Sequence, residues 1–297
     1  MSAKGFAVVD IHPTAVIDSG AVIGADVQIG PFCVIEANTH IGDRTRLESH
    51  VCIKSGTSLG EDNHVFDHAV LGGEPQHLNA PAEQGLLEIG SGNQFREYVT
   101  VHHALEKGHK TIIGNDNMLM VQSHIGHDSV IGNNTIITNN VLIGGHVLVE
   151  DRAYISGAVV VHQFCRVGRF AMVGGLARIV QDVAPYVTVD GRTSLVVGLN
   201  LIGLRRNGFD RHQIRKLKDA YRLLFRSDLP GGEAVAKART EFPDGPAAHF
   251  HDFLSQSERG FVQARQKGRA ATIEKPVKLR VHAEEETVED NTDRKAG

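Results

Sequence analysis

The stretch IGNDNMLMVQSHIGHDSVIGNNTIITNNVLI, residues 113–143, places a large aliphatic residue at every sixth position. A period of six fits neither a 3.6-residue helix nor the simple alternation of a strand. It is typical of a parallel β-helix, in which each hexapeptide contributes one short strand and one corner. Three hexapeptides close one triangular coil, and successive coils stack at the strand spacing of roughly 4.8 Å. The stretch therefore predicts an all-β solenoid.

The same period extends in both directions along the chain. It runs from Ile11 to Leu71, resumes between Ile89 and Val101, and continues from Ile113 to Ile179. We therefore expect a β-helix over residues 1–195. The interruptions at 74–88 and 104–110 are predicted to be inserted loops, which in repeat proteins often carry the binding function.

The pattern changes after Pro185. Asp210 is a candidate N-cap, and Ile214, Leu217 and Leu224 follow it at helical spacing. Residues 196–265 are predicted to form a C-terminal helical domain. Residues 266–297 are polar and charged, and we expect them to be disordered.

Composition excludes several classes of protein. A net charge of −4 gives no indication of a nucleic-acid-binding protein. The three cysteines have no CxxC spacing and are expected to be reduced thiols. The N-terminus has no signal-peptide pattern, and no apolar run approaches the length that a bilayer requires, so we expect no membrane span and a cytoplasmic location.

Histidines gather on one edge of the predicted solenoid. Counting in steps of three hexapeptides, one coil at a time, places Gly145 above His127 and Gln163 above Gly145. Further histidines lie beside this edge or one corner away from it: His124, His146 and His162.

Three interpretations of this cluster are open. The histidines could be solvated corner residues, or they could bind zinc across a subunit edge. The third is general-base catalysis, because a histidine can take a proton from a hydroxyl at neutral pH. Asp128 would then hold the tautomer of His127, and Gly145 would offer a bare N–H to an oxyanion. The side chain of Ser129 is expected to point elsewhere, which favours direct attack by a substrate hydroxyl over a covalent acyl-enzyme.

Five motifs, in order along the chain, carry a more specific signal: HIGHDSVIGNN, GGHVLVEDRAYISG, VHQFCRVGRFAMVGG, QDVAPYV and GLNLIGLRRNGF. Together they resemble the bacterial UDP-N-acetylglucosamine O-acyltransferase family, whose reaction begins lipid A biosynthesis. The resemblance extends from about Ile11 to Phe261.

The resemblance implies a left-handed parallel β-helix, against the usual right-handed crossover rule, and a homotrimer with active sites between subunits. It also implies transfer of an acyl chain, often R-3-hydroxyacyl, from the thioester of acyl carrier protein to the 3-hydroxyl of the UDP-sugar, with no metal or cofactor. The partners expected are acyl carrier protein and a UDP-sugar. The basic stretch from Arg211 to Arg226 is a candidate docking surface for the acidic carrier; a solvated amphipathic helix is the alternative.

The resemblance also implies roles for individual residues. His127 matches the catalytic base, Asp128 its companion and Gly145 the oxyanion-stabilising amide. Gly175 matches the residue that sets acyl length, and a glycine there points to a longer chain. The expected substrate-contact and nucleotide-contact residues are Gln76, His124, His146, His162, Gln163, Asn200 and Arg206.

Some positions depart from the family pattern. In the first insertion, which is also one residue shorter, His77 and Asn79 stand where Asp and Lys are usual. Ile202 replaces a nucleotide-binding Glu, and Asn207 stands where a second Arg is common. A missing polar contact shifts selectivity by roughly 1–3 kcal/mol. The acceptor is therefore open: UDP-N-acetylglucosamine, a modified sugar such as the 3-amino analogue, or another compound. A non-catalytic scaffold or zinc protein is the remaining alternative.

Overall fold

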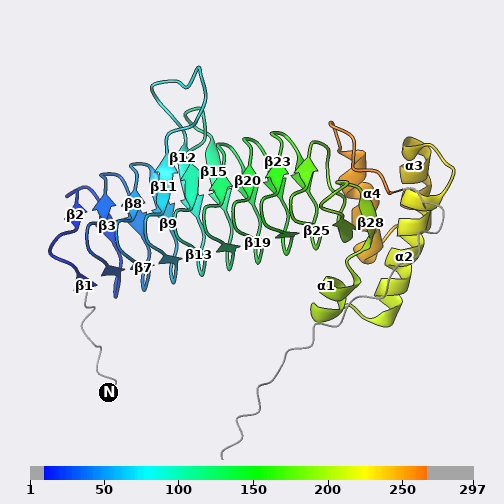
Figure 1. Cartoon of the computed structure of the whole chain (residues 1–297), viewed down its shortest axis with the longest axis horizontal. Coiled ribbons are helices and arrows are strands. Elements are labelled where there is room, and N and C mark those ends of the chain that lie inside the picture. The colour runs from blue at the N-terminus through cyan, green and yellow to red at the C-terminus, as the bar shows by residue number, and fades with distance from the viewer. Residues whose placement is uncertain (1–9, 266–297) are drawn as a thin grey trace, which may run out of the picture. The chain divides into compact units, whose positions relative to one another are not determined.

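The computed structural model describes residues 10–265, and the predicted tail at 266–297 lies outside them. These residues form a left-handed parallel β-helix that continues into a C-terminal group of helices (Figure 1). The expected boundary after residue 195 falls inside a single compact unit that ends at Arg265.

The β-helix has three parallel sheets, which we number in the order the chain visits them. The first sheet contains β1 (Asp10–Ile11), β4 (Gln28–Ile29), β7 (Arg46–Leu47), β10 (His64–Val65), β13 (Gln94–Phe95), β16 (Met118–Leu119), β19 (Ile136–Ile137), β22 (Tyr154–Ile155), β25 (Met172–Val173), β27 (Val187–Val189) and the antiparallel β28 (Val196–Leu199).

The second sheet contains β2 (Val16–Ile17), β5 (Val34–Ile35), β8 (Cys52–Ile53), β11 (Val70–Gly73), β14 (Thr100–His102), β17 (His124–Ile125), β20 (Leu142–Ile143), β23 (Val160–Val161) and β26 (Arg178–Ile179). The third sheet contains β3 (Val22–Ile23), β6 (His40–Ile41), β9 (Thr57–Leu59), β12 (Leu86–Ile89), β15 (Lys110–Ile113), β18 (Val130–Ile131), β21 (Leu148–Val149) and β24 (Arg166–Val167).

The register of the strands follows the hexapeptide count. His124 pairs with Leu142, and Leu142 pairs with Val160, so each coil advances by three hexapeptides. The offset grows where an insertion intervenes, since Thr100 pairs with His124, one hexapeptide beyond the regular step. The coils therefore stay aligned in space although the count along the sequence changes.

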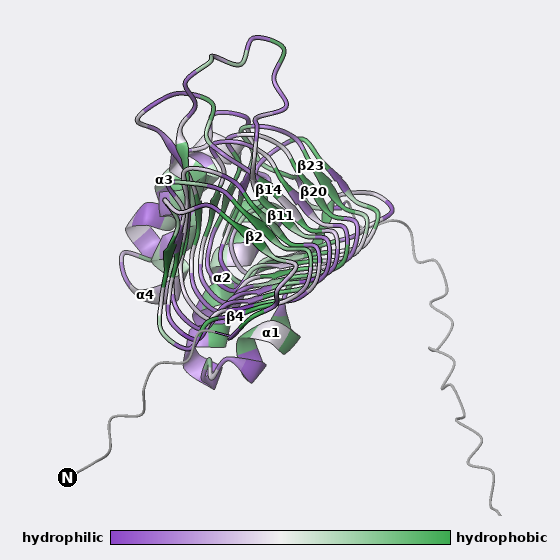
Figure 2. Ribbon diagram, turned by 90° about the vertical axis from the view of Figure 1, so that its left-hand side faces the viewer, coloured by the Kyte–Doolittle hydropathy of each residue, from purple (hydrophilic) through white to green (hydrophobic). Residues whose placement is uncertain are grey.

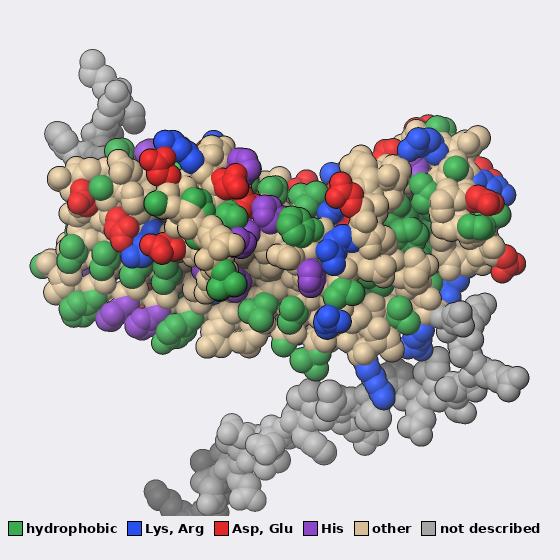
Figure 3. Space-filling view, turned by 90° about the horizontal axis from the view of Figure 1, so that it is seen from above, with side chains coloured by type: hydrophobic (Ala, Val, Ile, Leu, Met, Phe, Trp, Pro, Cys, Tyr) green, Lys and Arg blue, Asp and Glu red, His purple; other side chains and the backbone are tan. Residues whose placement is uncertain are grey.

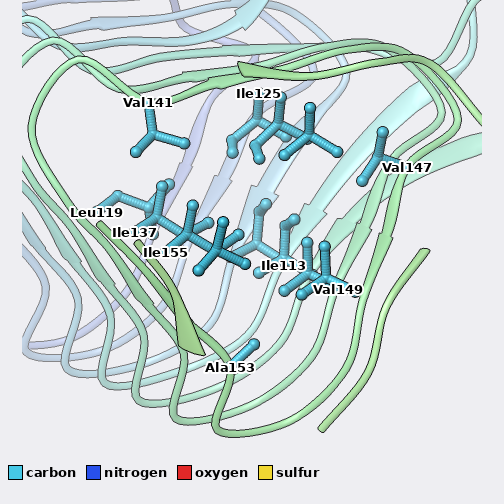
Figure 4. Packing of buried hydrophobic residues seen from close by; sticks show 14 of the residues in the cluster. Ile113, Leu119, Ile125, Ile137, Val141, Val147, Val149, Ala153 and Ile155 are labelled. Carbon is cyan, nitrogen blue, oxygen red and sulfur yellow. The ribbon is translucent and has the colours of Figure 1, made fainter. Parts of the chain in front are cut away.

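The repeating aliphatic side chains fill the interior of the coils. Figure 2 shows the coils end-on as a triangle, and Figure 4 shows Leu119, Ile137 and Ile155 stacked inside it. Burial of each such side chain stabilises the fold by about 1.5–3 kcal/mol. Ile11, by contrast, is 42% exposed, because it belongs to the first described coil.

The corners place ordinary residues in the left-handed backbone region. Asp128 and His146 have φ angles of 58° and 56°. This conformation costs roughly 1–2 kcal/mol for a residue with a side chain. The corners are held by hydrogen bonds between coils, such as the His146 N–H to the His127 carbonyl at 2.9 Å. The stacking thus fixes the direction in which corner side chains leave the β-helix.

Both insertions are present; the first is shorter than predicted, and the second has the predicted length but begins and ends one residue earlier. Strand β12 begins at Leu86, so the first insertion ends at Gly85 rather than at 88; the second ends at His109, because β15 begins at Lys110. Leu86–Ile89 pairs along its whole length with Lys110–Ile113, and this pairing extends the strands beyond the usual pair of residues. The first insertion projects from the β-helix beside β11 and β12 (Figure 1).

Four helices follow the β-helix: α1 (Leu201–Arg206), α2 (Arg211–Arg226), α3 (Gly231–Glu241) and α4 (Gly245–Ser255). The predicted N-cap of α2 is confirmed, since Asp210 and Gln213 form a capping box. Helix α4 is tied to the β-helix by His249, whose Nε2 lies 2.8 Å from a carboxylate oxygen of Glu150. Among the described helices, none is both long and apolar enough to cross a membrane.

Candidate functional site

A cleft of about 420 Å³ lies on the second sheet, beside the edge that this sheet shares with the third sheet. Histidine side chains gather about midway along the β-helix on the face shown in Figure 3. The cleft is lined by Gln76, His77, His102, His124, Gly126, His127, Leu142, Ile143, Gly144, Gly145, Val160, Val161 and Gln163.

His127 and Asp128 form a hydrogen-bonded pair at the corner between β17 and β18. Nδ1 of His127 lies 2.7 Å from Oδ2 of Asp128, and the side chains are only 12% and 7% exposed. The carboxylate also accepts the Leu105 N–H at 2.9 Å, and the Asp128 N–H donates to Thr111 Oγ1. Because a carboxylate only accepts, the proton of this hydrogen bond lies on Nδ1 of His127, and in the neutral form of the ring Nε2 is the acceptor.

Gly145 lies one coil above His127. A Cβ atom at Gly145 would come within 2.7 Å of His127 Nε2, so only glycine leaves room for the ring. Within residues 10–265, the Gly145 N–H donates to no backbone carbonyl. A free N–H beside an imidazole acceptor is the arrangement that stabilises an oxyanion next to a general base.

Two further histidines line the inner part of the cleft. The rings of His102 and His124 meet edge to face at 4.9 Å. Burial, together with the neighbouring imidazoles of His124, His127 and His103, lowers the pKa of His102 to about 4. Burial also lowers the pKa of His124, whose Nδ1 lies 2.9 Å from Thr100 Oγ1. Both rings are therefore neutral at neutral pH and can exchange hydrogen bonds with a polar ligand.

Some of the remaining predicted site residues lie at or beside the cleft, and the others lie away from it. Gln76 and Gln163 line the cleft with His127, and His146 contacts the His127 ring at a centroid distance of 5.1 Å. His162 is exposed beside Gln163, and its Nδ1 lies 3.0 Å from the carbonyl of that residue. Gly175 does not reach the cleft: it lies in the turn between β25 and β26, at the opposite edge of the second sheet.

Asn200 and Arg206 also lie elsewhere, in a second cleft of about 800 Å³ on the first sheet. Ile202 and Asn207 line this cleft too, together with Tyr154 of β22. The Asn200 side chain caps α1 by accepting the Gly203 N–H, and it donates to the Phe170 carbonyl. One chain therefore does not bring the expected nucleotide contacts to His127.

Sequence counting missed three histidines close to the site. His77 and His102 line the cleft, and His109 Nδ1 lies 3.6 Å from the Asp128 carboxylate. For His102, a step of three hexapeptides fails because the second insertion lengthens the step between β14 and β17 by one more hexapeptide. His77 and His109 lie within the insertions themselves, where the period does not apply. Counting back four hexapeptides from Gly126 reaches His102, so treating the insertion as a gap would have found it.

Asp128 is thus close to three imidazoles, those of His127, His109 and His146. Nitrogen and oxygen atoms of His127, Asp128 and His146 all lie within 4.8 Å of one another, close enough to share a metal ion. No H-x-x-x-x-H pair in the sequence indicates this grouping, because His146 comes from the coil above His127 and Asp128.

Models of known protein families match both parts of the chain. A model of bacterial transferase hexapeptide repeats matches residues 20–55 and 110–145, and one described as UDP N-acetylglucosamine O-acyltransferase, domain 2, matches residues 182–262.

Individual relatives match along most of the chain. A relative from Myxococcus xanthus named acyl-[acyl-carrier-protein]–UDP-N-acetylglucosamine O-acyltransferase is 45% identical over 255 residues, which are 85% of this chain and 99% of the relative. A protein of the same name from Synechocystis is 43% identical over 195 residues, 66% of this chain and 71% of that protein.

Solved structures are similar over the same span. The UDP-N-acetylglucosamine acyltransferase of Bacteroides fragilis matches with a TM-score of 0.83 and 38% identity, over 85% of this chain and all of that one. A homologous structure from Acinetobacter baumannii matches with a TM-score of 0.82 and 40% identity, over 85% and 99% of the two chains. The chain belongs to the UDP-N-acetylglucosamine O-acyltransferase family.

Proposed function

We propose that this chain transfers an acyl group, such as a 3-hydroxyacyl chain, from acyl carrier protein to the 3-hydroxyl of UDP-N-acetylglucosamine. The observation that carries the proposal is the 2.7 Å contact between His127 and Asp128, directly beneath the free N–H of Gly145. The name borne by the relatives supports the choice of donor and acceptor.

His127 acts as the general base in this proposal. Its Nε2 takes the proton of the sugar 3-hydroxyl while the oxygen attacks the thioester carbonyl, and the Gly145 N–H stabilises the resulting oxyanion. The tetrahedral intermediate then collapses: the C–S bond breaks, and the carrier thiolate receives the proton from His127. Asp128 keeps the ring oriented and stabilises the transient imidazolium. These steps use no cofactor.

Direct attack is favoured over a covalent acyl-enzyme. The nearest hydroxyl along the chain is that of Ser129, which is buried and donates to the Gly144 carbonyl at 2.9 Å. The residues that line the cleft include neither serine nor cysteine. A nucleophile of the enzyme would need to lie within hydrogen-bond reach of the base.

The acyl chain is proposed to lie across the second sheet. Leu142 and Val160 point outward from this sheet, are 46% and 43% exposed, and line the cleft next to His127. Gly175 borders the far edge of the same sheet and has no side chain to block it. This path favours a long acyl chain, in agreement with the expectation for Gly175.

A complete site is proposed to need a second copy of the chain. Asn200 and Arg206 lie on the first sheet, whereas His127 lies at the edge between the second and third sheets. Each interface of a cyclic homotrimer joins two different surface patches. The first sheet of one subunit could therefore face the His127 edge of its neighbour. Arg206 of one subunit would then contact the phosphates of a nucleotide whose sugar lies at His127 of another.

Three residues favour a second candidate, acyl transfer to a modified acceptor such as the 3-amino sugar. Ile202 is 65% exposed and offers no hydrogen bond where the family has a carboxylate. Asn207 Oδ1 accepts a hydrogen bond from Arg152 at 2.7 Å. His77 lines the cleft near His127 with a ring-centroid distance of 5.8 Å. The polar contacts that the acceptor meets therefore differ from those of the family pattern.

The test is a product assay with 3-hydroxyacyl carrier proteins of several chain lengths, offering UDP-N-acetylglucosamine and its 3-amino analogue separately and in competition. Mass spectrometry of the product identifies the acceptor. An ester product with the first sugar supports the leading proposal, and an amide formed preferentially supports the second. Ile202→Glu, with Ile202→Gln as its uncharged control, should shift the ratio of the two products by an amount corresponding to roughly 1–3 kcal/mol. No product with any donor and acceptor would favour a non-catalytic scaffold.

A further inference from the structure

The Asp128 carboxylate is surrounded by imidazoles from three segments that are separate in sequence. Its Oδ2 lies 2.7 Å from Nδ1 of His127 and 3.8 Å from Nε2 of His146, and its Oδ1 lies 3.6 Å from Nδ1 of His109. Within residues 10–265, every ion-pair partner of Asp128 is an imidazole, with no lysine or arginine among them. General-base catalysis requires only the first of these three contacts.

The spacing of these atoms is close to that of a zinc coordination sphere. Bonds of about 2.0–2.2 Å in a tetrahedral site place neighbouring ligand atoms roughly 3.3–3.6 Å apart. The candidate atoms of His127, Asp128 and His146 lie within 4.8 Å of one another, so small side-chain rotations would complete the geometry.

The backbone holds two of these ligands in place. Asp128 and His146 occupy successive left-handed corners, joined by the hydrogen bond from the His146 N–H to the His127 carbonyl. The Leu105 N–H donates to Oδ2 of the Asp128 carboxylate at 2.9 Å and so helps to fix its position. The His109 side chain, by contrast, is 62% exposed on the second insertion and is free to move toward an ion as a fourth ligand.

We propose that this cluster is an inhibitory site for a zinc-class transition-metal ion, with His127, Asp128 and His146 as ligands and His109 as the fourth. Imidazoles together with one carboxylate select Zn²⁺ over the oxygen-preferring Mg²⁺ and Ca²⁺. The ion takes the place of the proton on His127 Nδ1, which is released to solvent. The inhibition rests on the proposed function, because a metal-bound His127 is no longer oriented by Asp128 as a base. The metal binding itself does not depend on that function.

The test titrates Zn²⁺ into the full-length, chelator-treated protein by calorimetry and follows acyl transfer over the same concentrations. His109→Asn removes a ligand but no residue of the proposed catalytic machinery. We expect it to retain basal activity and to raise the Zn²⁺ concentration for half-inhibition by at least about tenfold, as loss of a supporting residue typically does. His146→Gln should abolish the binding step. His50→Ala, at an exposed corner where His50 stacks on His68 at 4.7 Å, is the matched control and should bind as the wild type does.

The outcomes separate this inference from the proposed function. One Zn²⁺ per chain, lost in His146→Gln and weakened in His109→Asn, supports the site even if no acceptor is turned over. Activity that is insensitive to Zn²⁺, with no binding step, overturns the inference and leaves the acyltransfer proposal intact. Binding that is lost in His50→Ala but unchanged in the other two variants places the ion at a different corner and also overturns it.

Discussion

Gly145 lies so close to His127 that a Cβ atom on it would come within 2.7 Å of the ring's Nε2. The backbone of Gly145 does not require glycine, because its φ angle lies outside the left-handed region. The constraint therefore comes from the His127 ring. Gly145→Ala keeps the backbone N–H but should displace the imidazole, and so lower kcat by about 10²–10⁴-fold, the contribution of a general base.

The matched control is Gly157→Ala, at the same position of the hexapeptide two repeats later. A Cβ there would meet only the Asn139 carbonyl at 3.5 Å and Thr138 Oγ1 at 3.8 Å. Steady-state kinetics of both variants with one donor should leave Gly157→Ala near the wild type. Equal losses in the two variants would mean that glycine is needed for stacking rather than for the site.

Mixed assembly tests whether the site forms between subunits. His127→Ala and Arg206→Ala should each be nearly inactive alone, because every site then lacks either its base or its phosphate contact. The two residues belong to different clefts of one chain. In trimers reassembled from equal amounts of both, about a quarter of the interfaces pair an intact His127 with an intact Arg206. Activity should recover to about that fraction of the wild type. Failure to recover, in mixed trimers verified by native mass spectrometry, would place both residues' functions within one chain.

Acid should destabilise the protein through His102. Burial and neighbouring imidazoles lower the pKa of this side chain to about 4, below its ordinary value of 6.5. As the pH falls from 6.5 toward 4, His102 becomes protonated in the unfolded chain but stays neutral in the folded chain, so the free energy of unfolding decreases. The loss should be of the order of 1–3 kcal/mol and absent above pH 7.

Urea unfolding at pH 7 and pH 5, at one protein concentration, measures this effect. His102→Gln should show a smaller difference between the two pH values than the wild type, whatever its stability at pH 7. An unchanged difference would exclude His102 as the source of acid sensitivity.

Helix α2 is expected to dock the carrier protein. Arg211, Arg215, Lys218 and Arg222 line one surface depression together with Arg205. Replacing Arg215 and Lys218 by Glu should raise KM for the acyl carrier protein by about tenfold or more at low salt and leave kcat nearly unchanged, because rim charges steer association. The same change at Lys237 and Arg239 on α3 is the control. Equal effects from both helices would indicate a nonspecific response to net charge.

Much of the fold could be predicted from sequence because the hexapeptide period is a physical requirement. An inward aliphatic residue is needed once per strand, and Ile125, Ile143 and Val161 show it on successive coils of the second sheet. The ends of the insertions could not be predicted, since Leu86–Ile89 forms a strand by pairing with Thr57–Leu59 on one side and Lys110–Ile113 on the other, across both insertions.

The candidate site also has features that the sequence period predicts and features that it does not. The alignment of His127 with Gly145 follows from a constant coil length. The approach of His109 to Asp128 depends on how the second insertion folds back, which the period does not encode. The separation of Arg206 from His127 could not be predicted, because it depends on the path of the chain beyond β26, where the repeat ends.

The most direct test of the account is the rate of acyl transfer by His127→Ala, measured with a 3-hydroxyacyl carrier protein and UDP-N-acetylglucosamine beside the wild type and His50→Ala. We predict that His127→Ala keeps its assembly state and loses about 10²–10⁴-fold in kcat, the contribution of a general base, while His50→Ala is unaffected. A His127→Ala rate within a few-fold of the wild type would contradict the assignment of His127 as the base.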